Sequence, residues 1–313
     1  MQFIAHIKKM KKNKFIVLRL VFIFFSTYIF AQDELLNNLL KEKKTEHEKI
    51  IATFKSTKII DAQTNETVHA HTLDFRVTHL FGNIGKETEG KSPVHTLYGF
   101  DASSDIRISF EYGITNRLTV GFSRSKVKEN LEGLAKYRIF YQSTDNHIPV
   151  SLTFFVNTAY TPQRDYSQNY KNAAHRFTYV TQGIISRKFS KNISAEILPT
   201  YVHRNYIIIP EDENDIFSLG AGARVKVTRS MSIIADYFYN FSQYRINRKT
   251  SYFNPLGLGV EFETGGHVFS LMFTNASSII ENEFIPYTTD GWQQGGIKFS
   301  FIISRNFSIG KYK

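Results

Sequence analysis

The chain of 313 residues contains no cysteine, which excludes disulfide bonds, thiolate metal sites, a cysteine nucleophile and a lipid anchor on cysteine. A long apolar run is also missing. The stretch LVFIFFSTYIFA at residues 20–31 has only 12 residues, whereas a helix needs about 20 to span a bilayer. The rest of the chain contains no comparable segment, so any membrane-facing surface has to be formed by alternating strands.

Residues 1–31 carry six basic residues and no acidic one. A basic region, a short apolar stretch and the small residue Ala31 predict a secretory signal peptide that is cleaved after export through the Sec pathway. Met10 is an alternative start of translation. Removal of this leader lowers the net charge from +11 to +5 (11 − 6), which argues against nucleic acid as a partner.

A short pattern recurs along the chain at residues 115–119, 190–194, 228–232 and 304–308. Each copy has a hydroxyl residue, two polar residues, a bulky apolar residue and a second hydroxyl residue. The copies begin 75, 38 and 76 residues apart, so a unit of about 38 residues fits them all, with skipped turns near 142–149 and 264–266. We interpret the pattern as a tight turn between antiparallel strands.

Longer, irregular connections separate these turns, and we expect them at residues 161–175, 204–215, 242–253 and 276–294. Alternation of short turns with long loops is typical of outer-membrane barrels, which have their short turns in the periplasm and their long loops outside. The long connections, including a loop around Asn282, are therefore expected to face the exterior.

The segments between the connections alternate with the period of a strand. Within residues 106–114, for example, Ile106, Ile108 and Phe110 share one face, and Arg107 and Glu111 share the other. Twelve strands are expected, with starts near residues 73, 104, 117, 132, 149, 176, 193, 216, 231, 253, 267 and 296. The last one contains QGGIKFSF, which is similar to the C-terminal signal read by the outer-membrane assembly machinery.

The sequence thus predicts an all-β fold: an up-and-down antiparallel transmembrane β-barrel of about 12 strands over residues 67–313, with a short N-terminal helical segment. A β-sandwich would alternate in the same way, but the charges favour the barrel, because opposite charges can pair across strands inside a lumen. A lysine at the outward-facing Val120 should be destabilising, and one at the lumen-facing Thr119 should be tolerated. The charges expected to face the lumen are Arg107, Glu111, Lys136, Arg138, Glu196, Arg224, Lys226, Asp236, Glu261 and Lys298.

Residues 32–66 form a separate N-terminal segment before the barrel. Leu35, Leu36, Leu39 and Leu40 have helical spacing and predict a short amphipathic helix over residues 33–50. The segment could be a periplasmic cap, a plug in the lumen or a disordered lead-in. The stretch IATFKSTKII that follows alternates weakly and could be an extra strand or a segment inside the lumen.

Several stretches resemble an uncharacterised family of Bacteroidetes outer-membrane β-barrels that is known only as a domain of unknown function. They are ATFKSTKIID, LDFRVTHLFG, YGFDASSDIRISFEYGITNRLTVGFSRS, GLAKYRIFYQS and PVSLTFF. The resemblance covers roughly residues 50–310. It implies a barrel in the cell envelope, and it implies no activity, cofactor or catalytic residue.

Chemical motifs are weak. His69 and His71 lie on one face of any strand, but two imidazoles without a third ligand do not define a metal site. His267 and Ser270 are three residues apart, on opposite faces of a strand, which argues against a serine–histidine pair. The lumen acids could act as glycosidase carboxylates, but the interleaved lysines and arginines favour structural ion pairs. The stretch PEDENDI lacks the ligand spacing of a calcium loop.

We therefore expect a protein that is not an enzyme and that has no cofactor or metal. Two functions stay open: a small outer-membrane channel or transport component with a charged lumen, and a non-conducting structural or ligand-binding barrel that acts through its external loops. An outer-membrane hydrolase is a more distant alternative. The expected partners are outer-membrane lipid, the barrel assembly machinery, and a small solute or an envelope protein.

Overall fold

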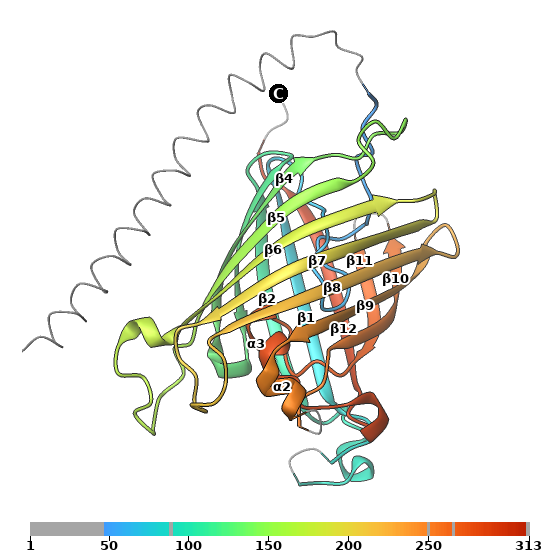
Figure 1. Cartoon of the computed structure of the whole chain (residues 1–313). Coiled ribbons are helices and arrows are strands. Elements are labelled where there is room, and N and C mark those ends of the chain that lie inside the picture. The colour runs from blue at the N-terminus through green and yellow to red at the C-terminus, as the bar shows by residue number, and fades with distance from the viewer. Residues whose placement is uncertain (1–46, 88–89, 249–250, 265–266, 311–313) are drawn as a thin grey trace, which may run out of the picture. The chain divides into compact units, whose positions relative to one another are not determined.

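The computed structural model describes residues 47–87, 90–248, 251–264 and 267–310. Its main feature is a closed barrel in which every strand pairs antiparallel with its neighbours in sequence and β12 pairs with β1 (Figure 1). The strands are β1 (Thr72–Asn83), β2 (Ser103–Gly113), β3 (Leu118–Ser125), β4 (Leu131–Phe140), β5 (Ser151–Tyr160), β6 (Phe177–Lys188), β7 (Ile193–Arg204), β8 (Asp215–Lys226), β9 (Met231–Phe241), β10 (Leu256–Thr264), β11 (His267–Thr274) and β12 (Lys298–Ser308).

Two short α-helices lie in the connections on the long-loop side: α2 (Gln243–Asn247) and α3 (Glu281–Tyr287). The described residues also form four 3-10 helices: η1 (Pro93–Thr96), η2 (Val127–Glu129), η3 (Ala173–Arg176) and η4 (Trp292–Gln294). Among the described residues, no helix is both long and apolar enough to cross a membrane.

The predicted fold is confirmed. Each strand begins within three residues of its expected start, and the barrel has the expected twelve strands. The pairing that closes the barrel runs from Thr72↔Ser308 to Asn83↔Lys298, with a register shift between Leu80 and Asn83. Because β1 and β12 satisfy each other's backbone hydrogen-bonding groups, the sheet has no open edge. A closed sheet is the condition under which strands can span a lipid bilayer.

The recurring turn has the same hydrogen bonds in three of its four copies. The hydroxyl oxygen of Thr115 accepts from the backbone N–H groups two and three residues later, and Ser190 and Thr228 do the same. The fourth copy was wrongly predicted as a turn. Residues 304–308 continue β12, because each of them pairs with a residue of β1 and so closes the barrel.

The two faces of the sheet have opposite character. Outward-facing side chains such as Phe110, Phe122 and Phe154 are about half exposed, and they form an apolar band around the barrel. Inward-facing positions are mostly buried and polar, as in β2, where Asp105, Arg107, Ser109 and Glu111 alternate with apolar residues. The barrel therefore has a polar interior and an apolar exterior, as a membrane requires.

The signal peptide and most of the expected helix over residues 33–50 lie outside the described residues. At residues 48–50 the chain is not helical. Lys49 instead bridges to Ser143 in the β4–β5 connection, and Ile50 donates its backbone N–H to Gln142. This contact lies at the end of the barrel that carries the short turns.

Candidate functional site in the barrel lumen

The lumen contains a segment of the chain itself. Residues 48–68, which we call the plug, run from the short-turn end into the barrel, and most of residues 53–68 are buried. The deepest part is a hairpin in which Ile59 N–H donates to Ala62 O (3.0 Å) and Thr64 N–H donates to Thr57 O (2.9 Å). The backbone polar groups that the plug buries thus find part of their partners within the hairpin.

The tip of the hairpin is apolar. Ile59 and Ile60 are almost completely buried and belong to the same hydrophobic cluster as wall residues such as Phe238. Two wall glycines make room for them. A Cβ at Gly222 would lie 3.0 Å from Ile59 Cδ1, and a Cβ at Gly257 would lie 2.6 Å from Ile60 Cγ2. Glycine at these wall positions is explained by the close approach of the plug together with the wall carboxylates of Glu196 and Asp236.

Cations of the wall bind the plug through its carbonyl groups. Lys136 Nζ donates to Thr57 O (2.9 Å), Thr64 O (3.1 Å) and Gln63 Oε1 (3.1 Å). Arg138 donates from Nε and Nη2 to Asn65 O. The same guanidinium forms an ion pair of 2.7 Å with Glu66 and donates to Ile51 O. Two positions on β4 therefore hold both arms of the hairpin.

Acids and hydroxyls of the wall bind the N–H and hydroxyl groups of the plug. Asp236 Oδ2 accepts from the backbone N–H groups of Asp61 and Ala62, both at 2.7 Å. Glu111 accepts from the Thr57 hydroxyl at 2.9 Å. Thr119 Oγ1 accepts from the backbone N–H of Val68 at 2.8 Å. Charge-assisted bonds of this kind are stronger than bonds between neutral groups.

Four of the ten charges that the sequence places on the lumen face therefore bind the plug through the hydrogen bonds and the ion pair described above. The other six have different surroundings. Arg107 pairs with Glu132, Arg224 pairs with Glu261 and Glu263, and Lys298 pairs with Asp290 of the β11–β12 connection. Glu196 lies beside Gly222 and Ile59. Lys226 is only half-buried, at the end of β8, and the remaining nine are buried.

Further buried charges of the wall lie outside the set expected from the sequence. Arg76 donates to Thr57 Oγ1 (2.6 Å) and pairs with Asp74 and Glu111. Glu132 is the partner of Arg107. The alternation of the strands could have identified these residues as lumen-facing. Glu132 has the same parity as Lys136 in β4, and Asp74 and Arg76 alternate with the apolar residues of β1.

The other end of the lumen is also filled. Residues 275–297, which we call the lid, connect β11 to β12 and fold inward, and α3 (orange-red in Figure 1) lies inside the barrel. The expectation that the loop around Asn282 faces the exterior is therefore wrong: Asn282 is fully buried and donates to Thr178. The cause is a set of contacts with distant wall residues that loop length alone does not reveal.

One wall carboxylate anchors the lid. Asp105 on β2 is fully buried and accepts hydrogen bonds from the Ser278 hydroxyl (2.6 Å) and the Ile279 N–H (3.0 Å) of the lid. It also accepts from the Ser125 hydroxyl and the Lys126 N–H of the wall. Because this carboxylate is satisfied by at least four donors, it holds the lid firmly against β2 and β3.

The plug and the lid meet in the middle of the lumen. Lys58 Nζ forms an ion pair of 3.2 Å with Glu281 at the start of α3, and both side chains are 1% exposed. Lys58 also donates to Ile279 O (2.7 Å), and Gln63 donates to Glu281 (3.0 Å). The described residues thus close the barrel interior from both ends.

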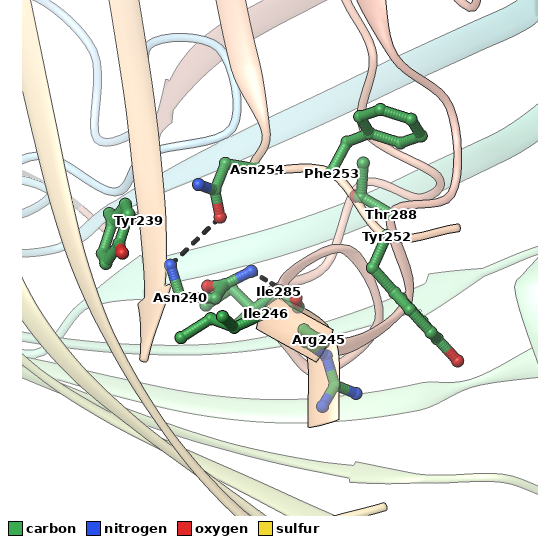
Figure 2. Close-up of a pocket in the computed structure, with 9 residues that line it drawn as sticks. All are labelled: Tyr239, Asn240, Arg245, Ile246, Tyr252, Phe253, Asn254, Ile285 and Thr288. Atoms are coloured by element: carbon green, nitrogen blue, oxygen red, sulfur yellow. Dashed lines mark hydrogen bonds between the residues drawn. The ribbon is translucent and has the colours of Figure 1, made fainter. Parts of the chain in front are cut away.

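A small cavity of about 180 Å³ lies on the long-loop side, between the β9–β10 connection and the lid. Figure 2 shows Asn240 between Asn254 and Ile285: its backbone N–H donates to Asn254 Oδ1 (3.1 Å), and its side chain donates to Ile285 O (2.8 Å). Arg245 donates to Pro286 O of the lid and to Asp212. The cavity thus lies between the β9–β10 connection and the lid, and hydrogen bonds from Asn240 and Arg245 join the two sides. These bonds help to anchor the lid.

The contact with Arg245 also keeps the carboxyl group of Asp212 ionised. Burial alone would raise the pKa of Asp212, but the hydrogen bond from Arg245 and the positive charges of Arg204 and Arg245 hold this pKa below its ordinary value. Asp212 therefore stays ionised and links the β7–β8 connection to α2. The positive charge of Arg245 is balanced and is not offered to a ligand.

The weak chemical motifs do not assemble into a site among the described residues. His267 stacks on Phe269, while Ser270 is buried on the opposite face of β11. His71 lies near the Tyr112 hydroxyl (3.3 Å). Within the described part of the chain, no three histidine and acidic residues gather as metal ligands. Apart from Glu196, the buried acids of the wall bind cations, hydroxyls or plug backbone.

Comparison with known proteins adds the following findings. The chain is similar in structure to the NanC porin (TM-score 0.46, 10% identity, 76% of this chain and 100% of that one) and the KdgM porin (TM-score 0.43, 8% identity, 76% and 99%). It is also similar to an outer membrane channel from Pseudomonas putida F1 (TM-score 0.46, 10% identity, 79% and 100%). A comparison with curated proteins finds no match.

The model of one protein family matches residues 54–307, which include the hairpin of the plug, the lid and all of the twelve strands except Ser308, the last residue of β12. The bacterial group suggested by the sequence resemblance stays a prediction. The chain belongs to the family described as a membrane bound beta barrel domain (DUF5777).

Proposed function

We propose that this protein is an outer-membrane channel for small polar solutes and that the plug and the lid close it in the state described here. In this proposal a cleaved signal peptide directs the chain through the Sec pathway, and the short turns face the periplasm. The observation that carries the proposal is the polar contact between the wall and the plug, in which Lys136, Arg138 and Asp236 bind plug backbone.

These contacts are suited to a reversible closure. Water can replace a wall side chain at a carbonyl or N–H group of the plug, because each net hydrogen bond to a charged group is worth only about 1.5–3 kcal/mol. The plug also lies before β1 in the chain, so it can leave through the short-turn end without breaking a strand pair. Wall pairs such as Arg107–Glu132 do not involve the plug and would remain.

Departure of the plug would uncover a wall of balanced charge. The charged wall side chains around the hairpin are three cations and three acids: Arg76, Lys136, Arg138, Glu111, Glu196 and Asp236. A lumen with both signs favours polar solutes without a large net charge over strongly charged ones. We infer that the solute class is small, hydrophilic and close to neutral.

A non-conducting barrel that acts through its external loops is the second candidate. The lid favours it, because Asp105 and the Lys58–Glu281 pair close the lumen independently of the outer part of the plug. In that case the plug would be a permanent part of the barrel core, and its removal would yield an unstable barrel or one still closed by the lid.

Conductance in planar bilayers distinguishes the two candidates. The full mature chain and a variant lacking residues 32–47 should both show little current, because each retains the plug. A variant lacking residues 32–66 should conduct, because it also lacks Lys58, whose contacts with Ile279 and Glu281 hold the lid in the middle of the lumen. Heat-modifiable migration in gels verifies that each barrel has folded. A folded variant lacking residues 32–66 that passes no current would overturn the channel and favour the second candidate.

A further inference from the structure

Three cations converge at the rim of the barrel on the short-turn side. Arg187 and Lys188 end β6, and Lys191 lies in the turn that follows. Together with Ile50, Gln142, Thr144, Asn146, Phe189 and Ser190 they line a cavity of about 330 Å³, which we call the rim pocket. Of the described residues that line it, none is acidic. None of the three cations forms an ion pair with another described residue.

Arg187 has an unusual position, because it belongs to the outward-facing side of β6. The inward-facing positions of this strand are buried, as at Ile184 and Ser186, and Arg187 follows the opposite parity. Its guanidinium donates to Pro149 O (2.8 Å) and Asn146 Oδ1 (3.0 Å). These bonds hold the cation at the membrane boundary, where a long basic side chain can keep its charge in the headgroup region.

Apolar side chains lie next to the cations. Phe189 is 62% exposed, and the Arg187 guanidinium lies 5.6 Å from the centre of its ring. Ile193, at the start of β7, is also exposed on the outward side. Basic groups beside an exposed apolar patch at the end of membrane strands match the two parts of a phospholipid, which are an anionic phosphate and an acyl chain.

The contacts of the other two cations leave room for such a ligand. Lys188 Nζ donates to Ala52 O (3.0 Å), so it holds the plug and adds positive charge to the pocket floor. Lys191 is exposed in the turn. The turn itself is held by the Ser190 hydroxyl, which accepts from the N–H groups of Asn192 and Ile193, so it presents Lys191 without the help of that side chain.

We propose that the rim pocket binds the phosphate of an anionic phospholipid in the leaflet that the short turns face, with an acyl chain along Phe189. This inference concerns the lipid partner and does not depend on conduction through the lumen. A basic residue near an anionic membrane surface contributes about 1 kcal/mol, which corresponds to about fivefold in affinity.

The test uses the full mature chain in detergent, with phosphatidylglycerol, phosphatidylcholine or inorganic phosphate added, and measures bound lipid by native mass spectrometry. Phosphatidylglycerol should be retained several-fold better than phosphatidylcholine. Lys191→Gln should weaken its binding about fivefold, and Arg187→Gln combined with Lys191→Gln should weaken it further. The matched control is Arg164→Gln with Lys171→Gln in the β5–β6 connection, which should bind like the unaltered chain.

Lys191→Gln keeps the test valid if the Arg187 variant fails to fold, because the hydrogen bonds described for this turn join the Ser190 hydroxyl to backbone N–H groups and do not involve the Lys191 side chain. Equal retention of the two lipids would overturn the proposal. So would a loss of binding in the control variant equal to that in the rim variants. Displacement of phosphatidylglycerol by inorganic phosphate alone would show a site for free phosphate and would overturn the assignment to a lipid.

Discussion

Truncation of Ile59 tests how firmly the plug is held. The side chain is completely buried, and its Cδ1 lies in the space that Gly222 leaves open. Removal of a buried isoleucine side chain down to alanine costs about 2–5 kcal/mol. Ile59 lies outside every barrel strand, so the loss falls on docking of the plug and leaves the strand ladder intact. A loss of about 2–5 kcal/mol raises the undocked fraction about 30- to 5,000-fold.

The assay exploits the absence of native cysteine. Ser56 is buried in the plug, and Ser56→Cys introduces a single thiol of nearly the same size. A membrane-impermeant maleimide should label this thiol at a rate proportional to the undocked fraction, so Ile59→Ala should accelerate labelling by the factor given above. The control is Ile108→Ala, because Ile108 is 44% exposed on the outward face. Unchanged labelling in the Ile59 variant would refute the assigned packing of the plug.

Further predictions concern the wall, the lid and the sidedness of the barrel. Val120→Lys on the outward face should lower the free energy of unfolding in vesicles by about 2–4 kcal/mol, and an unchanged value would contradict the face assignment. Thr119→Lys should also be destabilising in urea titrations, because Thr119 is fully buried against the plug; tolerance would indicate an open lumen. Asp105→Ala should free the lid and accelerate proteolysis within residues 275–297, and an unchanged rate would refute the anchor. An epitope tag after Asn169 should be reached by antibody on intact cells and a tag after Lys191 should not; equal labelling would contradict the topology.

The strands could be predicted from the sequence because a membrane barrel imposes alternation at every position. Phe110 and Phe122 must face lipid, while Arg107 and Glu111 must avoid it, so the two faces differ sharply in composition. The repeated turn could be predicted for a similar reason, since a hydroxyl that caps two N–H groups leaves a local signature. Residues 304–308 carry the same signature but extend β12, because pairing with β1 outweighs the local preference.

The plug and the lid could not be assigned in the same way. Their contacts join residues far apart in sequence, such as Lys58 with Glu281 and Asp105 with Ser278. The usual burial rule also fails inside a polar lumen, where a segment rich in threonine and charge is buried by hydrogen bonds. For this reason the sequence alone predicts that Thr119→Lys is tolerated, whereas the structure predicts that it is destabilising.

A reducible disulfide between the plug and the wall tests the central claim, which is that the docked plug closes the lumen and that the lumen opens when the plug leaves. A Cβ built at Gly257 lies 3.1 Å from Ile60 Cβ, about 0.7 Å less than the mean separation in a disulfide, and 2.6 Å from Asp236 Oδ1. Ile60→Cys with Gly257→Cys should therefore form a disulfide once the tip of the plug and the Asp236 side chain have shifted by this amount. The measurement is single-channel current of this variant before and after reduction. We predict silence in the oxidised state and, after reduction, openings with the conductance of the chain that lacks residues 32–66, because the reduced plug has lost the packing of Ile60. The same current in both states, or silence in both, would contradict the account.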